Sequence, residues 1–229
     1  MTDSLCVSRP SEPVFLRTLL HDFRSPLASI LALANFGRLR PSLRPDESRA
    51  LLLDISSAAA HLNELADMAL FVTKAEVNAF AVERKLFNLD RLAKTVVEEL
   101  RPQADGMGVI IENDIRFHNL IADAQLVEVA LRSLLRSAIK YSTSANVVRL
   151  APLVRPAERG EQAGFTISFS MPGTGNNVGE PIPSRFGREG LFQLDLALLF
   201  SMQVANGHGG ALTARTTGDY LEIEFLLPQ

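Results

Sequence analysis

Two long series of apolar residues at helical spacing dominate the first third of the chain. In the first, apolar side chains recur in steps of three and four from residue 16 to residue 34. In the second, they follow a heptad pattern from residue 51 to residue 72. Such spacing predicts two amphipathic helices. Gly37 and the Arg40-Pro41 pair should end the first helix, and Pro45-Asp46-Glu47 should begin the second.

Two helices joined by a short turn form a hairpin, and a hairpin with one long apolar seam cannot enclose a core alone. Pairing with a second copy would complete a dimeric four-helix bundle. The alternative is that the seam packs on the rest of the same chain. The dimer is favoured, because the remaining residues contain enough apolar segments for a core of their own.

The remainder of the chain alternates helical and extended patterns. Helices are predicted at 88–103, 123–141 and 191–206, and strands at 108–113, 146–154, 164–170, 212–215 and 220–227, with a loop at 171–188. Helices interleaved with a mostly antiparallel sheet predict an α+β sandwich. The 229 residues therefore divide into an N-terminal tail at 1–12, a helical hairpin at 13–80 and an α/β domain at 86–229.

Composition excludes several classes of function. The 23 basic and 26 acidic residues leave a net charge of -3, which does not indicate a nucleic-acid partner. The single cysteine, Cys6, excludes an internal disulfide and a multi-cysteine metal site, and no metal is expected. No apolar run approaches the roughly 18 residues of a membrane span, and Met1-Thr2-Asp3-Ser4 lacks the features of a signal peptide. We therefore expect no membrane insertion and a cytoplasmic location.

His21 lies on the wrong face of the first helix for a core residue. At about 100° per residue, the apolar stripe falls roughly 160–280° away from it, so His21 should face water. Asp22 follows it directly, Arg24 and Ser25 lie on its side of the helix, and Pro26 should bend the axis. A carboxylate can take the ring proton and a cation can offset phosphate charge. This set suits phosphoryl transfer to an imidazole, whereas the alternative is an ordinary surface histidine.

The run His21-Asp22-Phe23-Arg24-Ser25-Pro26-Leu27 resembles the H-box of bacterial histidine kinases, whose pattern is His-[Glu/Asp]-x-[Arg/Asn]-[Thr/Ser]-Pro-Leu. The resemblance implies that His21 is the phosphoacceptor and that Asp22 assists proton removal. Ser25 stands where family members with phosphatase activity usually carry Thr or Asn, which argues against a strong phosphatase role.

The resemblance extends over nearly the whole chain. The segment 123–142 is similar to the N-box helix of the kinase ATPase domain, and 207–212 with the last strands is similar to its C-terminal pattern. The expected fold is therefore a helical hairpin followed by a histidine-kinase-type, ATPase-like α/β sandwich.

The positions that the resemblance assigns to nucleotide binding are altered. Ser137 replaces the asparagine that ligates magnesium, and Ser133 replaces the other usual asparagine of the N-box. With Gly173 as the anchor of the first glycine box, Phe169 replaces the aspartate that accepts the adenine amino hydrogen, and Met171 replaces a glycine. Lys140 and Tyr141 remain, and we expect them to serve as scaffold in such a degenerate site.

The second glycine box is altered as well. Counting back from Gly209-Gly210 puts Gln193-Leu194-Asp195-Leu196-Ala197-Leu198 there, without glycine and with an added negative charge. Gly190-Leu191 is an alternative alignment. His118, His208 and His61 are expected to be a loop residue, a helix-end residue and an exposed structural residue, respectively.

These changes favour a domain that keeps the fold and has lost ATP and magnesium, as in the ChpT-type histidine phosphotransferases that the chain resembles. The chain would carry phosphate on His21 and exchange it with receiver-domain aspartates of response regulators, as a homodimer, with an upstream hybrid kinase as a further partner. Two alternatives stay open. One is an active histidine kinase core that binds ATP and magnesium through atypical contacts. The other is a non-catalytic scaffold that binds receivers or kinases.

Overall fold

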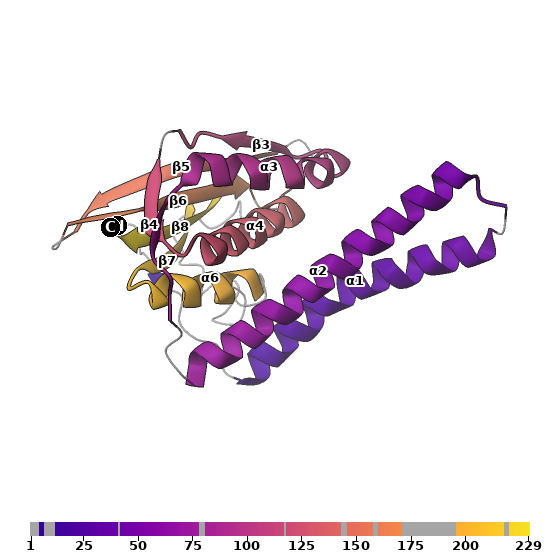
Figure 1. Cartoon of the computed structure of the whole chain (residues 1–229), viewed down its shortest axis with the longest axis horizontal. Coiled ribbons are helices and arrows are strands. Elements are labelled where there is room, and N and C mark those ends of the chain that lie inside the picture. Colours follow the sequence, from indigo (N-terminus) through magenta and orange to yellow (C-terminus); the bar gives the residue numbers. More distant parts are fainter. Residues whose placement is uncertain are drawn as a thin grey trace.

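The first two long helices, α1 (Glu12–Leu39) and α2 (Pro45–Val77), lie side by side as a hairpin (Figure 1). The predicted hairpin is thus confirmed. The computed structural model describes residues 5–6, 12–40, 42–77, 81–116, 118–142, 146–157, 160–170, 196–217 and 220–229. In this part of the chain, no helix has both the length and the apolar character that crossing a bilayer requires.

The first helix ends at Leu39, directly before the Arg40-Pro41 pair that was predicted to end it, whereas Gly37 lies inside the helix. A Cβ atom on Gly37 would lie 2.7 Å from Cδ2 of Leu51 on the facing helix. The glycine is therefore a point of close approach between α1 and α2, near the turn that joins them, rather than a stop signal.

The apolar stripe of α1 divides into two faces. Leu19, Phe23 and Ile30 are half-buried, and Leu19 and Phe23 pack against the core. Four leucines at steps of four and seven stay 46–59% exposed: Leu16, Leu20, Leu27 and Leu31. The hairpin thus leaves a leucine seam along α1 that nothing in the described chain covers.

The second part of the molecule is built from short elements in alternation. They are β2 (Lys85–Asn88), α3 (Leu89–Gly106), β3 (Ile110–Asn113), β4 (Asn119–Ala122), α4 (Ala124–Tyr141), β5 (Val147–Pro156), β6 (Glu161–Ser170), α6 (Leu196–Gly207), β7 (Ala211–Thr217) and β8 (Tyr220–Pro228). The predicted helices and strands are all present, with shifted ends. The sequence missed the β2–β4 pair and the two-residue strand β1 (Leu5–Cys6).

Six strands form one sheet in the order β1-β7-β8-β6-β5-β3, in which only β3 and β5 pair in parallel. The helices α3, α4 and α6 form a layer on one face of this sheet, and the hairpin lies against that layer (Figure 1). The stacked rings of Phe165 and Phe225, 5.0 Å apart, lie in the buried core. This is the predicted sandwich, preceded by a helical hairpin.

Local signals explain where two of these helices begin. Asn88 caps α3 by accepting a hydrogen bond from the N–H of Arg91, and Asp123 caps α4 by accepting from the N–H groups of Gln125 and Leu126. The helix α3 extends past its predicted end and contains Pro102. The loop predicted at 171–188 and the first residues of the helix predicted at 191–206 lie outside the described residues.

Replacing Gly164 with alanine should strongly destabilise the sheet. A Cβ atom there would lie 1.8 Å from the carbonyl oxygen of Phe225, within the β6–β8 pairing. We expect the free energy of unfolding to fall by about 3 kcal/mol in urea denaturation followed by circular dichroism. Gly106→Ala is the matched control, because nothing lies within 4 Å of its added Cβ atom. An equal loss in both variants would contradict this reasoning.

Candidate functional site

His21 and Asp22 are adjacent on α1 but face opposite environments. The His21 side chain is 64% exposed, as predicted, whereas that of Asp22 is 3% exposed. His21 Nδ1 lies 3.2 Å from Asp22 Oδ1. A proton on Nδ1, directed at this carboxylate, would leave Nε2 as the nitrogen with a lone pair. The pair therefore has the geometry of a nucleophilic imidazole held by an acid.

Asp22 also joins the hairpin to the α/β domain. Its Oδ2 accepts a hydrogen bond from the N–H of Leu196 in α6 at 2.9 Å, and Oδ1 lies 3.9 Å from Nζ of Lys140 in α4. One carboxylate thus contacts His21, a backbone N–H and an ammonium group. Sequence reasoning anticipated the first of these partners and missed the other two.

Pro26 removes one backbone hydrogen bond of α1 next to Asp22. It has no N–H to donate to the carbonyl four residues earlier, which is that of Asp22. Nevertheless α1 is helical on both sides of Pro26, which is itself buried. The helix thus loses one backbone hydrogen bond at the residue that bridges the two domains.

The other two residues of the predicted set have different surroundings. Arg24 and Ser25 are both exposed, and the carbonyl of Ser25 accepts a hydrogen bond from the hydroxyl of Ser29. Ser25 lines a cavity of about 740 Å³ between the hairpin and α3, α4 and α6, and Arg24 does not. Asp22, Ser137 and Lys140 line it as well, so the cavity brings together the segments that resemble the H-box and the N-box.

The positions that the resemblance assigns to nucleotide binding carry two serines and a phenylalanine among the described residues. The hydroxyl of Ser137 donates to the carbonyl of Ser133, and that of Ser133 donates to the carbonyl of Ala130, so both hydroxyl protons are directed at the helix backbone. Phe169 is 1% exposed and part of the core. Neither serine offers the amide oxygen of an asparagine, and Phe169 offers no acceptor.

Lys140 and Tyr141 lie together at the end of α4, with Nζ of the lysine 5.1 Å from the centre of the tyrosine ring. Gly173, Met171 and Gln193-Leu194-Asp195 lie outside the described residues, so the glycine boxes are seen only through Phe169 and through Leu196, Ala197 and Leu198, all buried. The described side chains at these positions thus differ from the asparagines and the aspartate of the family pattern.

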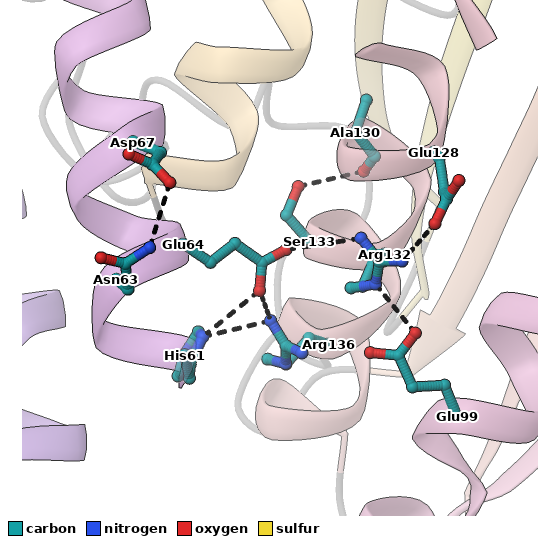
Figure 2. A network of polar contacts seen from close by, with 10 residues as sticks. All are labelled: His61, Asn63, Glu64, Asp67, Glu99, Glu128, Ala130, Arg132, Ser133 and Arg136. Atoms are coloured by element: carbon teal, nitrogen blue, oxygen red, sulfur yellow. Dashed lines mark hydrogen bonds and ion pairs between the residues drawn. The ribbon is translucent and has the colours of Figure 1, made fainter. Parts of the chain in front are cut away.

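A second polar cluster, around Glu64 of α2, joins the hairpin to the α/β domain (Figure 2). Glu64 on α2 forms an ion pair with Arg136 on α4, and its other oxygen lies 3.9 Å from Arg132. His61 Nδ1 lies 3.1 Å from Arg136 Nη1 and 3.8 Å from Glu64. Arg132 in turn hydrogen-bonds Glu99 at 3.0 Å. His61, predicted to be exposed, is half-buried, because the α/β domain packs against this part of α2.

The environment of Glu64 has opposing effects on its pKa. Burial raises the pKa, but the contacts with His61 and Arg136 and the charge of Arg132 outweigh it and lower the pKa to about 2. The ionised carboxylate is thus strongly favoured when the two domains are packed together. The sequence carried no signal for this cluster, because its two helices are 72 residues apart at the Glu64–Arg136 pair.

The stability of the folded chain should therefore fall in acid through Glu64. Its pKa is lower when folded than the ordinary 4.5, so its contribution is complete above about pH 4.5 and is lost as the pH falls toward 2. The difference of about 2.5 units corresponds to at most about 3 kcal/mol. In urea denaturation, Glu64→Gln should be less stable than wild type at pH 6 and nearly equal to it at pH 2.5.

Glu47→Gln is the control for that measurement. Contact with Arg44 lowers the pKa of Glu47 as well, but this side chain lies at the surface, where solvent screens the pair. Its substitution should change stability little at either pH. A deficit of Glu64→Gln that stayed constant from pH 6 to pH 2.5 would contradict the assignment.

His208, directly after α6, is 1% exposed and has a structural role. Its Nδ1 lies 2.7 Å from the carbonyl of Val204, and its Nε2 accepts a hydrogen bond from the N–H of Asp123 at 3.0 Å. Because both ring nitrogens are engaged in the core, His208 is no alternative phosphoacceptor. His118, predicted in a loop, does lie outside the helices and strands.

Relatives of the chain are found among signalling proteins. The "Non-motile and phage-resistance protein" of Caulobacter vibrioides is 25% identical over 228 residues, which cover 93% of this chain and 27% of the relative. The "Circadian input-output histidine kinase CikA" of Synechococcus elongatus is 25% identical over 220 residues, covering 89% of this chain and 28% of the relative. The chain thus spans about a quarter of the length of these relatives. No protein-family model matches it.

Solved structures share the fold. The histidine kinase AdeS of Acinetobacter baumannii is 16% identical and superposes with a TM-score of 0.58, covering 91% of this chain and 97% of that one. Full-length ShkA in complex with AMPPNP has a TM-score of 0.56 at 21% identity, over 95% of this chain and 46% of that one. The histidine kinase ThkA in complex with the response regulator TrrA has a TM-score of 0.54 at 17% identity, over 95% and 61%.

Proposed function

We propose a function for the chain as a distant homologue of histidine kinase cores, in which a hairpin is followed by an ATPase-like domain. We propose that the chain is a two-component phosphorelay protein. It carries a phosphoryl group on His21, exchanges it with receiver-domain aspartates of response regulators, and binds no ATP itself. The supporting observation is that Asp22 holds His21 from one side and engages Leu196 N–H and Lys140 on the other.

The transfer step needs only groups that the chain and the receiver contain. The lone pair of His21 Nε2 attacks the phosphorus of a receiver aspartyl phosphate, an N–P bond forms, and the P–O bond to the aspartate breaks. The aspartate leaves as a carboxylate, and Asp22 stabilises or accepts the proton on Nδ1. The same reaction in reverse passes the phosphoryl group from His21 to another receiver. In this scheme the phosphoryl group comes originally from an upstream hybrid kinase and not from ATP bound by this chain.

A homodimer fits the open leucine seam. Leu16, Leu20, Leu27 and Leu31 are each about half-exposed on α1, and α2 adds Leu52 and Leu53, 63% and 62% exposed. A patch of this kind along a helical hairpin is unusual for a monomer and suits a four-helix bundle of two chains. Gel filtration with light scattering tests this part of the proposal directly.

An active kinase core is the second candidate. It is favoured by Lys140 and Tyr141, which remain at the end of α4, and by the kinases among the similar proteins. In this reading, Ser137 and unusual groups of the glycine boxes hold nucleotide. The candidate requires that Lys140 leave Asp22 and turn to a phosphate.

Titration of the chain with ATP and magnesium separates the two candidates. The phosphorelay proposal expects no saturable binding up to about 1 mM, the upper end of ordinary substrate affinities. An active histidine kinase measured in parallel controls the assay. Saturable binding with labelling of His21 from radioactive ATP would overturn the loss of nucleotide and favour the kinase.

Incubation with a phosphorylated receiver tests the positive half of the proposal. Label should pass from the receiver to the chain within the lifetime of the aspartyl phosphate. If receivers form a complex with the chain while no label moves, the protein is a scaffold and the transfer function is wrong.

A further inference from the structure

Three cations of α4 form a ladder on one side of the helix. Arg132, Arg136 and Lys140 are spaced four residues apart, which places them along the same face. Each approaches a carboxylate of the hairpin. Lys140 lies 3.9 Å from Asp22 on α1, Arg136 pairs with Glu64 on α2, and Arg132 lies 3.9 Å from the other oxygen of Glu64.

Both carboxylates are withdrawn from water. The side chains of Asp22 and Glu64 are 3% and 19% exposed. Burial of a carboxylate is costly unless a cation or donor compensates for the lost hydration. These two residues therefore favour the position of the ATPase-like domain in which α4 faces them, and they should become hydrated when it moves away.

The compensation is incomplete at Glu64. One of its oxygens, Oε1, is buried without a hydrogen-bond partner, since Arg132 approaches it only to 3.9 Å. Arg132 is shared with Glu99 and Glu128, both in the ATPase-like domain. A contact that satisfies only part of a buried charge holds the two domains together less firmly than a fully paired one.

Apolar contacts between α2 and α6 lie beside the ladder. Leu65, Met68 and Val72 of α2 are buried, and the rings of Phe71 and Phe200 are 4.9 Å apart. Apolar packing is not directional, whereas charge pairs define orientation. The apolar patch can therefore act as a pivot, while the ladder selects one orientation about it.

We propose that Asp22 and Glu64 form with the α4 ladder an electrostatic clasp that holds the ATPase-like domain closed over the phosphoacceptor helix. When the clasp opens, the domain turns about the α2–α6 contact, and Asp22 releases both Lys140 and the N–H of Leu196. The clasp is a property of the domain arrangement and does not rest on the proposed transfer of phosphate. The alternative is a set of ion pairs that contribute to stability without controlling orientation.

Distances between spin labels test the clasp in the full chain. Cysteines replace Ser56 on α2 and Thr95 on α3, both exposed, in a Cys6→Ser background. Dilution with unlabelled chain restricts the measurement to distances within one chain. Wild type should give one narrow distribution. Arg136→Gln and Glu64→Arg should broaden it and add a population at longer distance.

Charge exchange distinguishes orientation from simple stability. The double variant Glu64→Arg with Arg136→Glu should restore the narrow distribution. The control is Glu99→Gln, which removes a carboxylate of the same network that lies within the ATPase-like domain, and it should leave the distribution unchanged. Circular dichroism confirms that each variant is folded, and Arg136→Met, which keeps the aliphatic part of the side chain and lacks the charge, replaces Arg136→Gln if the latter is not.

A folded Arg136→Gln or Glu64→Arg variant with the wild-type distribution would overturn the proposal. So would broadening by Glu99→Gln as large as that by Glu64→Arg, because the effect would then come from general loss of stability. Neither outcome bears on phosphotransfer, so failure of the clasp and failure of the proposed function remain distinguishable.

Discussion

Replacing His21 with alanine is expected to abolish transfer of label from a phosphorylated receiver to the chain. The imidazole is the only nitrogen nucleophile that the H-box presents, and its side chain is 64% exposed. Alanine removes the attacking lone pair without disturbing the core. The side chain at this position then has no nucleophile that could accept the phosphoryl group, even slowly. Residual label should be below a hundredth of wild type, within the detection limit of a radioactive gel assay.

The chemistry of the label provides a second criterion. A phosphoryl group on nitrogen is lost in acid and survives in alkali, whereas an aspartyl phosphate is labile in alkali. Label on the wild-type chain should therefore disappear in acid and persist in base. His118→Ala is the matched control, since it removes another imidazole, outside the hairpin, and should leave the label intact. Equal labelling of His21→Ala and wild type would exclude His21 from the mechanism.

Local patterns in the sequence explain how much of the fold could be foreseen. Helical periodicity reports which face of a helix is apolar, and it located both long helices and the outward position of His21. It could not distinguish the two halves of the α1 stripe. Leu19 packs against the core and Leu20 is exposed to solvent, yet both are leucines at adjacent positions. Which half is covered depends on where α2 lies, which the stripe alone does not encode.

Short strands and contacts between distant segments were beyond such patterns. The strands β2 and β4 have four residues each, too few for a clear alternation, and they are recognisable only as a pair. The clusters around Asp22 and Glu64 join residues 174 and 72 positions apart in the sequence. The H-box pattern identified Asp22 as the partner of His21, but its bond to Leu196 follows only from the packing of the two domains.

Substitution of Asp22 with asparagine should have the second largest effect. Asparagine has nearly the same shape, and its side-chain oxygen can still accept the hydrogen bond from Leu196. It loses the negative charge that attracts Lys140 and that stabilises the proton on His21 Nδ1. We expect the melting temperature to stay close to wild type, while the rate of transfer falls by about 10²-fold, in the usual range for general acid–base assistance.

Asp54→Asn is the matched control, because Asp54 is a hairpin carboxylate that lines the same cavity. It should transfer at the wild-type rate. The pH dependence of the rate separates two roles for Asp22, since a group that orients or deprotonates the imidazole changes the profile, whereas a group that only joins the domains does not. Asp22→Glu should recover part of the rate if the charge is what matters. An unchanged rate in Asp22→Asn, with the stability lowered, would make Asp22 solely a contact between the hairpin and the α/β domain, because only the lost charge pair with Lys140 would then have a measurable consequence.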